Sequence, residues 1–240
     1  GRGVWRETLD ALAPGVRAIT YDRRAYGDSG APEPYGGTTV GEQADDLAEL
    51  IRSLGAAPAL LVGHELGALA ALDLLLREPA LGCGAVLIEP SMLWLSAGGT
   101  DAMSTLRDVV EKAAIDGGGG AAVAAFLEVV DGHAALQRLG QERLAAAQAA
   151  PRAFAADMAA AATWPATRRE LRQIDAPVTI VTGERSAPVR REAASALADL
   201  LPNAELVSVA AGHLAHVEAA AEVAGQIALR AAGCAQRAHV

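Results

Sequence analysis

Short apolar runs recur along the chain and alternate with longer segments of helical periodicity. Runs of Val, Ile and Leu of this length are typical of strands buried on both faces of a sheet. The candidate strands are residues 16–24, 58–65, 84–90, 176–184 and 204–210. Apolar residues three and four positions apart predict helices over 39–55 and 66–77 and from about Glu218 to the end, with Gly55 placed to end the first of them. Strands separated by helices in this way predict a doubly wound α/β fold with a mostly parallel sheet.

One long segment breaks this alternation. From Ser91 to about Trp164 the chain has alanine-rich helical stretches and no convincing strand. Its glycine run at 117–120 follows no strand and has no lysine after it, which favours a flexible link between helices over a phosphate loop. We therefore expect a helical lid over 92–165, inserted into a core formed by 1–91 and 166–240. A string of surface helices is the alternative.

Composition narrows the class of protein. The 240 residues are 52% hydrophobic and carry a formal net charge of −9, so a soluble globular domain that binds no nucleic acid is expected. The apolar runs are too short to span a bilayer, and no signal-peptide pattern opens the sequence. Cys83 and Cys234 lie far apart without metal-ligand spacing, which favours reduced, buried cysteines in a cytoplasmic protein.

Four motifs carry a family resemblance: "YDRRAYGDSG" (21–30), "GHELG" (63–67), "PVTIVTGERSAP" (177–188) and "AAGHLAHVE" (210–218). In this order they resemble the α/β-hydrolase superfamily over essentially the whole chain, with Ala25 where glycine is usual. The resemblance implies a sharp turn at 63–67 between a strand and a helix, and a catalytic histidine at position 213. The family's second oxyanion donor lies on a His-Gly loop before the stretch that "GRGVWRETLDALAPG" resembles, so no residue is assigned to it.

The turn at 63–67 carries Glu65 where the family usually has serine. Such a turn needs small residues around its tip, and Gly63 and Gly67 are expected to meet that need. The amide of Leu66, at the start of the following helix, is then an oxyanion donor. An ordinary solvated glutamate near a helix start is the alternative reading of Glu65.

His213 resembles the family's general base, and its orienting partner is open. Ser186 stands where the family commonly carries aspartate, and it could orient the imidazole but not neutralise its charge. Glu184 and Glu89 are alternative orienting acids. A further alternative is that Glu65 itself supplies the negative charge.

The other histidines carry weaker expectations. His64 is expected to point away from the tip of the turn and to pack, and it remains a candidate residue of the substrate pocket. His216 is expected at the surface or behind the site. His133 and His239 have no supporting context.

The chemistry of a carboxylate limits the reaction. Attack of a carboxylate on an ester gives an anhydride, whereas attack on an epoxide or alkyl halide gives an ester that water can cleave. The lid contains no tyrosine to protonate an opened epoxide, so Trp94 and Trp164 are considered as donors, in an aliphatic pocket that includes Met92.

Three functions follow. The first is hydrolysis of a small apolar epoxide or ester by Glu65 and His213. The second is a lyase or cyclase in which both residues only move protons, and the third is a binding module without catalysis. No cofactor and no metal are expected, and the chain is expected to be a monomer or a homodimer.

Overall fold

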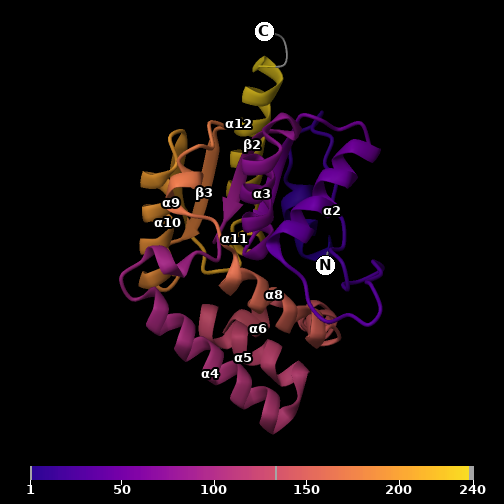
Figure 1. Ribbon diagram of the computed structural model, residues 1–240, viewed down its shortest axis with the longest axis vertical. Helices are drawn as coiled ribbons and strands as arrows, with labels where there is room; N and C mark the ends of the chain where they lie inside the picture. The colour runs from indigo at the N-terminus through magenta and orange to yellow at the C-terminus, as the bar shows by residue number, and fades with distance from the viewer. Residues whose placement is uncertain (1, 133, 238–240) are drawn as a thin grey trace.

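Four parallel strands form the centre of the computed structural model, which describes residues 2–132 and 134–237 (Figure 1). The strands stand in the order β1 (Ala59–His64), β2 (Gly82–Ile88), β3 (Val178–Gly183) and β4 (Ala204–Val209), and each is parallel to its neighbour. Parallel neighbours need crossover connections, and helices supply them on both sides of the sheet. The predicted doubly wound α/β fold is confirmed.

The unbroken apolar runs are explained by burial on both faces of the sheet. On β2, Ala85 and Leu87 face one cluster, whereas Val86 and Ile88 face the other. The first cluster includes residues of α2 (Val40–Ser53), α3 (Leu66–Arg77) and α10 (Pro188–Leu200). The second includes residues of α12 (Ala220–Arg237), which packs against β1, β2 and β3. Successive side chains of a strand point to opposite faces, so a strand covered by helices on both sides shows no polar alternation.

The end of α2 follows the predicted pattern. Gly55 adopts φ 56°, its N–H donates to the carbonyl of Arg52 at 3.1 Å, and the N–H of Ala56 donates to the carbonyl of Ile51 at 2.9 Å. These two bonds satisfy carbonyl groups that the helix leaves free, and the left-handed conformation they require suits glycine.

The strand predicted over residues 16–24 is absent: this segment forms no ladder with the sheet. A cavity of about 1760 Å³ is lined by residues 16–23 on one side and by β1 on the other. A strand exists only through hydrogen bonds to a neighbour, and this segment has no strand as a neighbour.

The segment 92–165 is helical, as predicted. It contains η3 (Leu93–Leu95), α4 (Gly99–Gly117), α5 (Gly119–Asp131), α6 (Ala134–Leu139), α7 (Gln141–Gln148) and α8 (Pro151–Thr163). The labelled α4, α5, α6 and α8 gather at the lower end of the molecule in Figure 1. Helices α5 and α6 bury a small cluster of their own around Val123, Leu127 and Leu139, together with Leu214 from the core, and α7 and α8 pack against it.

The glycine run at 117–120 is a tight turn rather than a flexible link. Gly118 adopts φ 79° between α4 and α5, and a Cβ on Gly119 would overlap Pro151 of α8. Glycine is needed here because the two helices reverse direction against a third.

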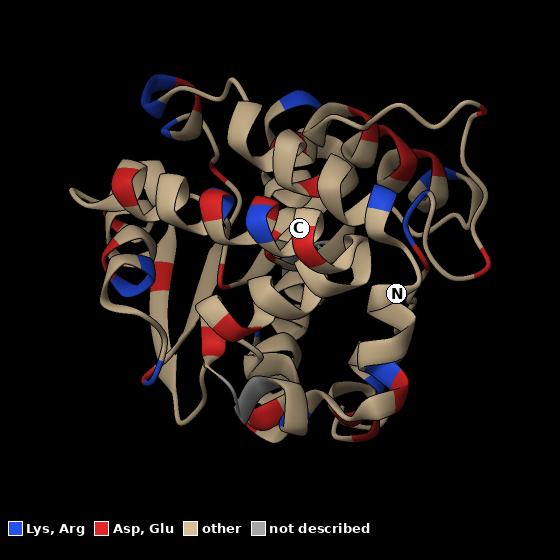
Figure 2. Ribbon diagram, turned by 90° about the horizontal axis from the view of Figure 1, so that it is seen from below, with Lys and Arg blue, Asp and Glu red and all other residues tan. Residues whose placement is uncertain are grey.

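The remaining helices are short. They are η1 (Arg2–Trp5), α1 (Arg6–Asp10), η2 (Pro79–Leu81), α9 (Arg168–Leu171) and α11 (Ala215–Glu218). In the described parts of the chain no helix is both long and apolar enough to cross a membrane. Acidic and basic residues are interspersed along the ribbon rather than gathered by sign (Figure 2).

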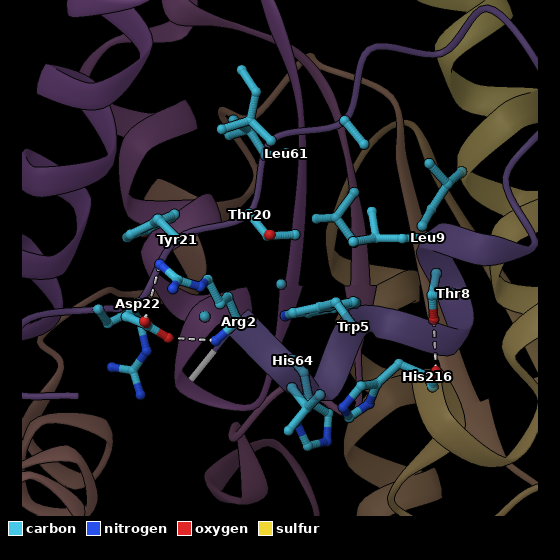
Figure 3. A pocket seen from close by; sticks show the side chains of 18 of the residues that line it. Arg2, Trp5, Thr8, Leu9, Thr20, Tyr21, Asp22, Leu61, His64 and His216 are labelled. Atoms are coloured by element: carbon cyan, nitrogen blue, oxygen red, sulfur yellow. Dashed lines mark hydrogen bonds and ion pairs between the residues drawn. The ribbon is translucent and has the colours of Figure 1, made fainter. Parts of the chain in front are cut away.

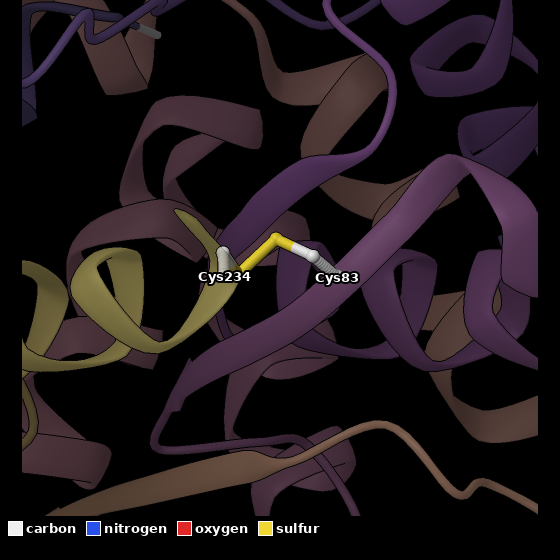
Figure 4. Close-up of a disulfide and its surroundings, with 2 residues drawn as sticks. All are labelled: Cys83 and Cys234. Carbon is white, nitrogen blue, oxygen red and sulfur yellow. A yellow bond between two sulfur atoms is a disulfide. The ribbon is translucent and has the colours of Figure 1, made fainter. Parts of the chain in front are cut away.

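The prediction of two separate, reduced cysteines is wrong. Cys83 on β2 and Cys234 on α12 form a disulfide, with 5.5 Å between their Cα atoms and 151 residues between them in sequence (Figure 4). The pair forms because α12 packs across β2, which sequence spacing does not reveal. Disulfides persist mainly in oxidising compartments, so the cysteines no longer favour a cytoplasmic location.

Candidate active site

Glu65 occupies the sharp turn between β1 and α3. Its backbone adopts φ 53° and ψ −119°, a region that costs a residue with a side chain about 1–3 kcal/mol. A Cβ on Gly63 would overlap the backbone of Gly67, so glycine is required at position 63. A Cβ on Gly67 would meet nothing within 4 Å, so the expectation that both positions must be small is correct only for Gly63. Leu66 begins α3, and its N–H is among the donors that a helix start leaves without an intrahelical partner.

The structure brings Glu65 and His213 into contact. Nε2 of His213, on the loop between β4 and α11, lies 2.9 Å from Oε1 of Glu65. The His213 side chain is 1% exposed and that of Glu65 18% exposed. A carboxylate therefore meets an imidazole in a site that is closed to water on the histidine side.

Arg190, which the sequence reading missed, completes this contact. Its Nη1 donates to the same Oε1 of Glu65 at 2.7 Å, and its side chain is only 7% exposed. A signal was present in the sequence, because Arg190 shares the buried stripe of α10 with Ala193, Ala194 and Leu197 at helical spacing. A charged residue on such a stripe requires a partner inside the protein.

Glu89 lies on the opposite side of the histidine ring. Its Oε2 is 3.4 Å from Nδ1 of His213, and its backbone follows β2 with φ 46°. Three groups donate to its Oε1: the hydroxyl of Ser186 at 2.6 Å, the N–H of Gly183 at 2.8 Å and the hydroxyl of Thr182 at 2.9 Å. These donors fix the carboxylate beside the ring.

The three candidate orienting residues differ in whether they contact His213. Glu89 is the one that meets His213, and Ser186 bonds to Glu89. Glu184 is exposed to solvent, and within the described residues its side chain makes no hydrogen bond or ion pair with the histidine. The loop that follows β3 therefore contributes to the site through Ser186 and not through Glu184.

The charges of the site stabilise one another. Burial alone would raise the pKa of Glu65, but Arg190 and His213 outweigh it and lower this pKa to about 2. Burial would likewise raise the pKa of Glu89, and the hydrogen bonds from His213 and Ser186 lower it. Burial and Arg190 oppose the charged form of His213, yet the two carboxylates raise its pKa above the ordinary value. The two carboxylates thus favour the charged form of the imidazole, and Arg190 favours the charged form of Glu65.

His64 supports the histidine loop from behind. Its Nε2 lies 3.0 Å from the carbonyl oxygen of His213, and its ring stands 4.7 Å from the ring of His213 and 4.4 Å from that of His216. Burial, followed by the charge of His213, lowers the pKa of His64 to about 4, so it acts as a neutral donor. His216 was expected at the surface or behind the site, and its 1% exposure excludes the surface. His133 and His239 lie outside the described residues.

The large cavity approaches the site from the His64 side. Trp5, His64 and His216 line it and lie close together (Figure 3). The helical segment contributes apolar lining residues, among them Phe126, whose ring centroid is 6.5 Å from that of His213. The cavity therefore passes beside the histidine loop, but neither Glu65 nor His213 lines it, and charged residues such as Arg23, Glu142 and Arg143 are part of its wall.

Of the residues expected to bind substrate, His64 lines this cavity, whereas Met92, Trp94 and Trp164 do not. Met92 is 1% exposed and belongs to the main core, and the Trp94 ring packs against that core beneath the guanidinium of Arg168. The indole N–H of Trp164 donates to Asp73 at 3.0 Å, so it is already engaged. Helix η3, which follows Met92, packs against α10 and α4, and its Leu93 and Leu95 belong to the same core. Among the described residues no three His, Cys, Asp or Glu side chains are placed so that they could hold a metal ion together.

A parallel sheet, a turn that presents Glu65 at the end of a strand and a histidine loop after the last strand together define an enzyme-like α/β fold of the hydrolase type. The chain belongs to the Alpha/beta hydrolase family, whose model matches residues 1–226.

The chain is also similar to individual proteins. It is 36% identical over 85 residues to the candidate carbamate hydrolase RutD of Agrobacterium fabrum, a match that covers 35% of this chain and 32% of that protein. The alignment thus spans about a third of the length of this relative. Among solved structures, an esterase from Thermogutta terrifontis has a TM-score of 0.76 at 23% identity, covering 97% of this chain and 86% of that one. An enol-lactonase from Burkholderia xenovorans has a TM-score of 0.74 at 20% identity, covering 96% and 86%. These two likenesses support the fold alone.

Proposed function

We propose that this chain hydrolyses a small apolar substrate of the epoxide or ester type, with Glu65 and His213 as catalytic residues. The observation that carries the proposal is the 2.9 Å contact between Oε1 of Glu65 and Nε2 of His213, with Glu89 on the far side of the ring. Membership of a hydrolase family and similarity to an esterase, a lactonase and a candidate carbamate hydrolase agree with hydrolysis. Phe126, from the proposed helical lid, stands beside the ring of His213, which suits an apolar substrate.

With an epoxide, the reaction has two steps. Oε2 of Glu65 attacks a ring carbon, the bond from that carbon to the epoxide oxygen breaks, and the oxygen takes a proton from charged His213. Water then adds to the carbonyl carbon of the Glu65 ester while neutral His213 accepts one proton of that water. The N–H of Leu66 stabilises the oxyanion. The ester C–O bond breaks, the second proton of the water goes to the departing alkoxide, and a diol and the Glu65 carboxylate result.

With an ester, the same pair acts without a covalent intermediate. A carboxylate that attacked an ester would form an anhydride, so Glu65 and His213 would instead remove a proton from water that adds to the substrate carbonyl. The source of the oxygen in the product distinguishes this route from the one above.

The test is a single turnover in ¹⁸O-labelled water with protein in excess over substrate. A panel of aryl epoxides, aryl esters and lactones identifies a substrate first. For the covalent route, ¹⁸O appears in the peptide that contains Glu65 and is absent from the first equivalent of diol. For direct attack by water, ¹⁸O appears in the product. Both routes predict that Glu65→Gln and His213→Gln abolish turnover.

Two outcomes would overturn the proposal. Turnover of a panel substrate that continues undiminished in both variants would remove Glu65 and His213 from the reaction. Absence of turnover on the whole panel, together with tight binding of apolar ligands, would favour a binding module. The variant Glu65→Ser adds a further check, because a gain of esterase activity would mean that position 65 selects the reaction.

A further inference from the structure

Arg190 contacts only one of the two carboxylate oxygens of Glu65. Nη1 of Arg190 and Nε2 of His213 both meet Oε1, at 2.7 Å and 2.9 Å. Within the described residues no hydrogen bond is made to Oε2. The Glu65 side chain is 18% exposed, and its Oε1 is held by a residue inside the protein.

The position of Arg190 is fixed by α10. The arginine lies in the first turn of the helix, on the stripe that packs into the main core, and is 7% exposed. A guanidinium presents planar donors in a fixed fork, so a buried arginine sets the direction of the carboxylate it binds.

We propose that Arg190 is a positioning residue for Glu65: it holds Oε1 against His213 and leaves Oε2 as the oxygen that meets the substrate or its water. This inference rests on the proposed function of Glu65 and adds to it a division of labour between the two oxygens. Arg190 acts through Glu65 and is assigned no contact with the substrate.

The charge of Arg190 also affects the pKa of Glu65. The groups that face Glu65 are Arg190 from α10, His213 from the loop after β4 and His64 from β1, and behind His213 lies Glu89. Burial opposes the charged form of Glu65, and Arg190 is the largest influence that favours it. Without the arginine, an ionised Glu65 would depend on the histidines His213 and His64, and the carboxyl would take up a proton at a higher pH.

The experiment compares Arg190→Met and Arg190→Lys with the wild-type protein. The readout is the ¹³C NMR shift of the Glu65 carboxyl carbon in protein labelled at glutamate, followed over pH and assigned by its loss in Glu65→Gln. In Arg190→Met the pKa of Glu65 rises by about 1–3 pH units, the usual effect of an adjacent opposite charge. Arg190→Lys restores the charge but not the planar fork, so the pKa stays close to that of the wild type.

Arg191→Met is the matched control, because Arg191 is the next residue of α10 and is exposed. It should leave the titration of Glu65 unchanged. Once a substrate is known, Arg190→Met should lower kcat about 10- to 100-fold, and kcat should fall further at acid pH as Glu65 becomes protonated. Arg190→Lys should also lower kcat, because Glu65 is misaligned, but without the additional fall at acid pH.

The titration needs no turnover, so it separates this inference from the proposed function. An unchanged Glu65 titration in folded Arg190→Met would overturn the inference, whatever the activity. A shifted titration in a protein without hydrolase activity would support the role of Arg190 and contradict the function proposed for Glu65. If Arg190→Met does not fold, Arg190→Gln, which keeps a neutral donor on a shorter side chain, takes its place with the same expected rise.

Discussion

The backbone N–H of His213 donates a hydrogen bond to Oδ1 of Asp131, with 2.8 Å between nitrogen and oxygen. Asp131 is the last residue of α5, so the helical segment holds the histidine loop directly. A Cβ on Gly212 would overlap the Asp131 carboxylate, which explains glycine before the histidine. Arg138 binds both Asp131, at 3.0 Å, and Glu218, at 2.7 Å, and so closes a second link between segment and core. The helices over the sheet are thus connected to the proposed base and do more than cover it.

Removal of this link should slow the reaction without removing any reacting group. In Asp131→Ala the His213 loop loses its acceptor, and kcat falls about 10- to 100-fold, because a displacement of the base by an ångström is costly. Asp131→Asn keeps an oxygen in the same place and should retain most of the activity. Steady-state kinetics on the substrate found by the panel measures both variants. Equal losses in the two would contradict a positioning role for this hydrogen bond. Asp116→Ala, at an exposed site on α4, serves as the control.

The pH profile should reflect the raised pKa of His213. Burial opposes the charged imidazole, but Glu65 and Glu89 favour it, so the neutral base appears only as the pH rises above the ordinary histidine range. The water-dependent step should therefore accelerate as the pH rises through the pKa of His213. Glu89→Gln removes one negative neighbour, lowers the pKa of His213 and moves this limb to lower pH. The profile of the single-turnover rate of ester cleavage tests both statements. A limb that stays at the same pH in Glu89→Gln would mean that Glu89 does not orient His213.

The turn at Glu65 offers a test of stability that needs no substrate. In Gly63→Ala the new methyl group would overlap the backbone of Gly67, and the free energy of unfolding should fall by about 1–3 kcal/mol. In Gly67→Ala the methyl group meets nothing within 4 Å, and alanine is a better helix residue than glycine. Stability should therefore be unchanged or rise by up to about 1 kcal/mol. Denaturant unfolding of both variants makes the comparison, and a similar loss in the two would contradict the described packing of β1 against α3.

The disulfide should contribute strongly to stability. It closes a loop with a sequence separation of 151 residues, so reduction should lower the free energy of unfolding by about 2–5 kcal/mol. Unfolding curves with and without dithiothreitol measure the difference. The double variant Cys83→Ser and Cys234→Ser should resemble the reduced protein and should not respond to the reductant. Identical curves for oxidised and reduced wild-type protein would mean that the two cysteines are not joined in solution.

Several features of this protein were predictable because they depend on short stretches of chain. A strand covered on both faces must be apolar throughout, so β1, β2 and β3 were evident as unbroken Val, Ile and Leu runs. A helix that ends in a left-handed residue favours glycine, which marked Gly55. The tight approach of a strand to its following helix requires glycine at 63, which marked the turn and its unusual residue, Glu65.

The rest was decided by packing between distant segments. The approach of α10 brings Arg190 to a carboxylate 125 positions away, and the crossing of α12 over β2 joins Cys83 to Cys234. The choice of Glu89 over Glu184 as neighbour of His213 depends on which carboxylate faces inward, and the absence of strand 16–24 depends on its having no strand beside it. Sequence periodicity predicts only which side of a helix or strand is buried. It does not predict which residue that side contacts, because the contact depends on how distant segments pack. For Arg190, Glu89 and the disulfide, the chemistry depends on the identity of that partner.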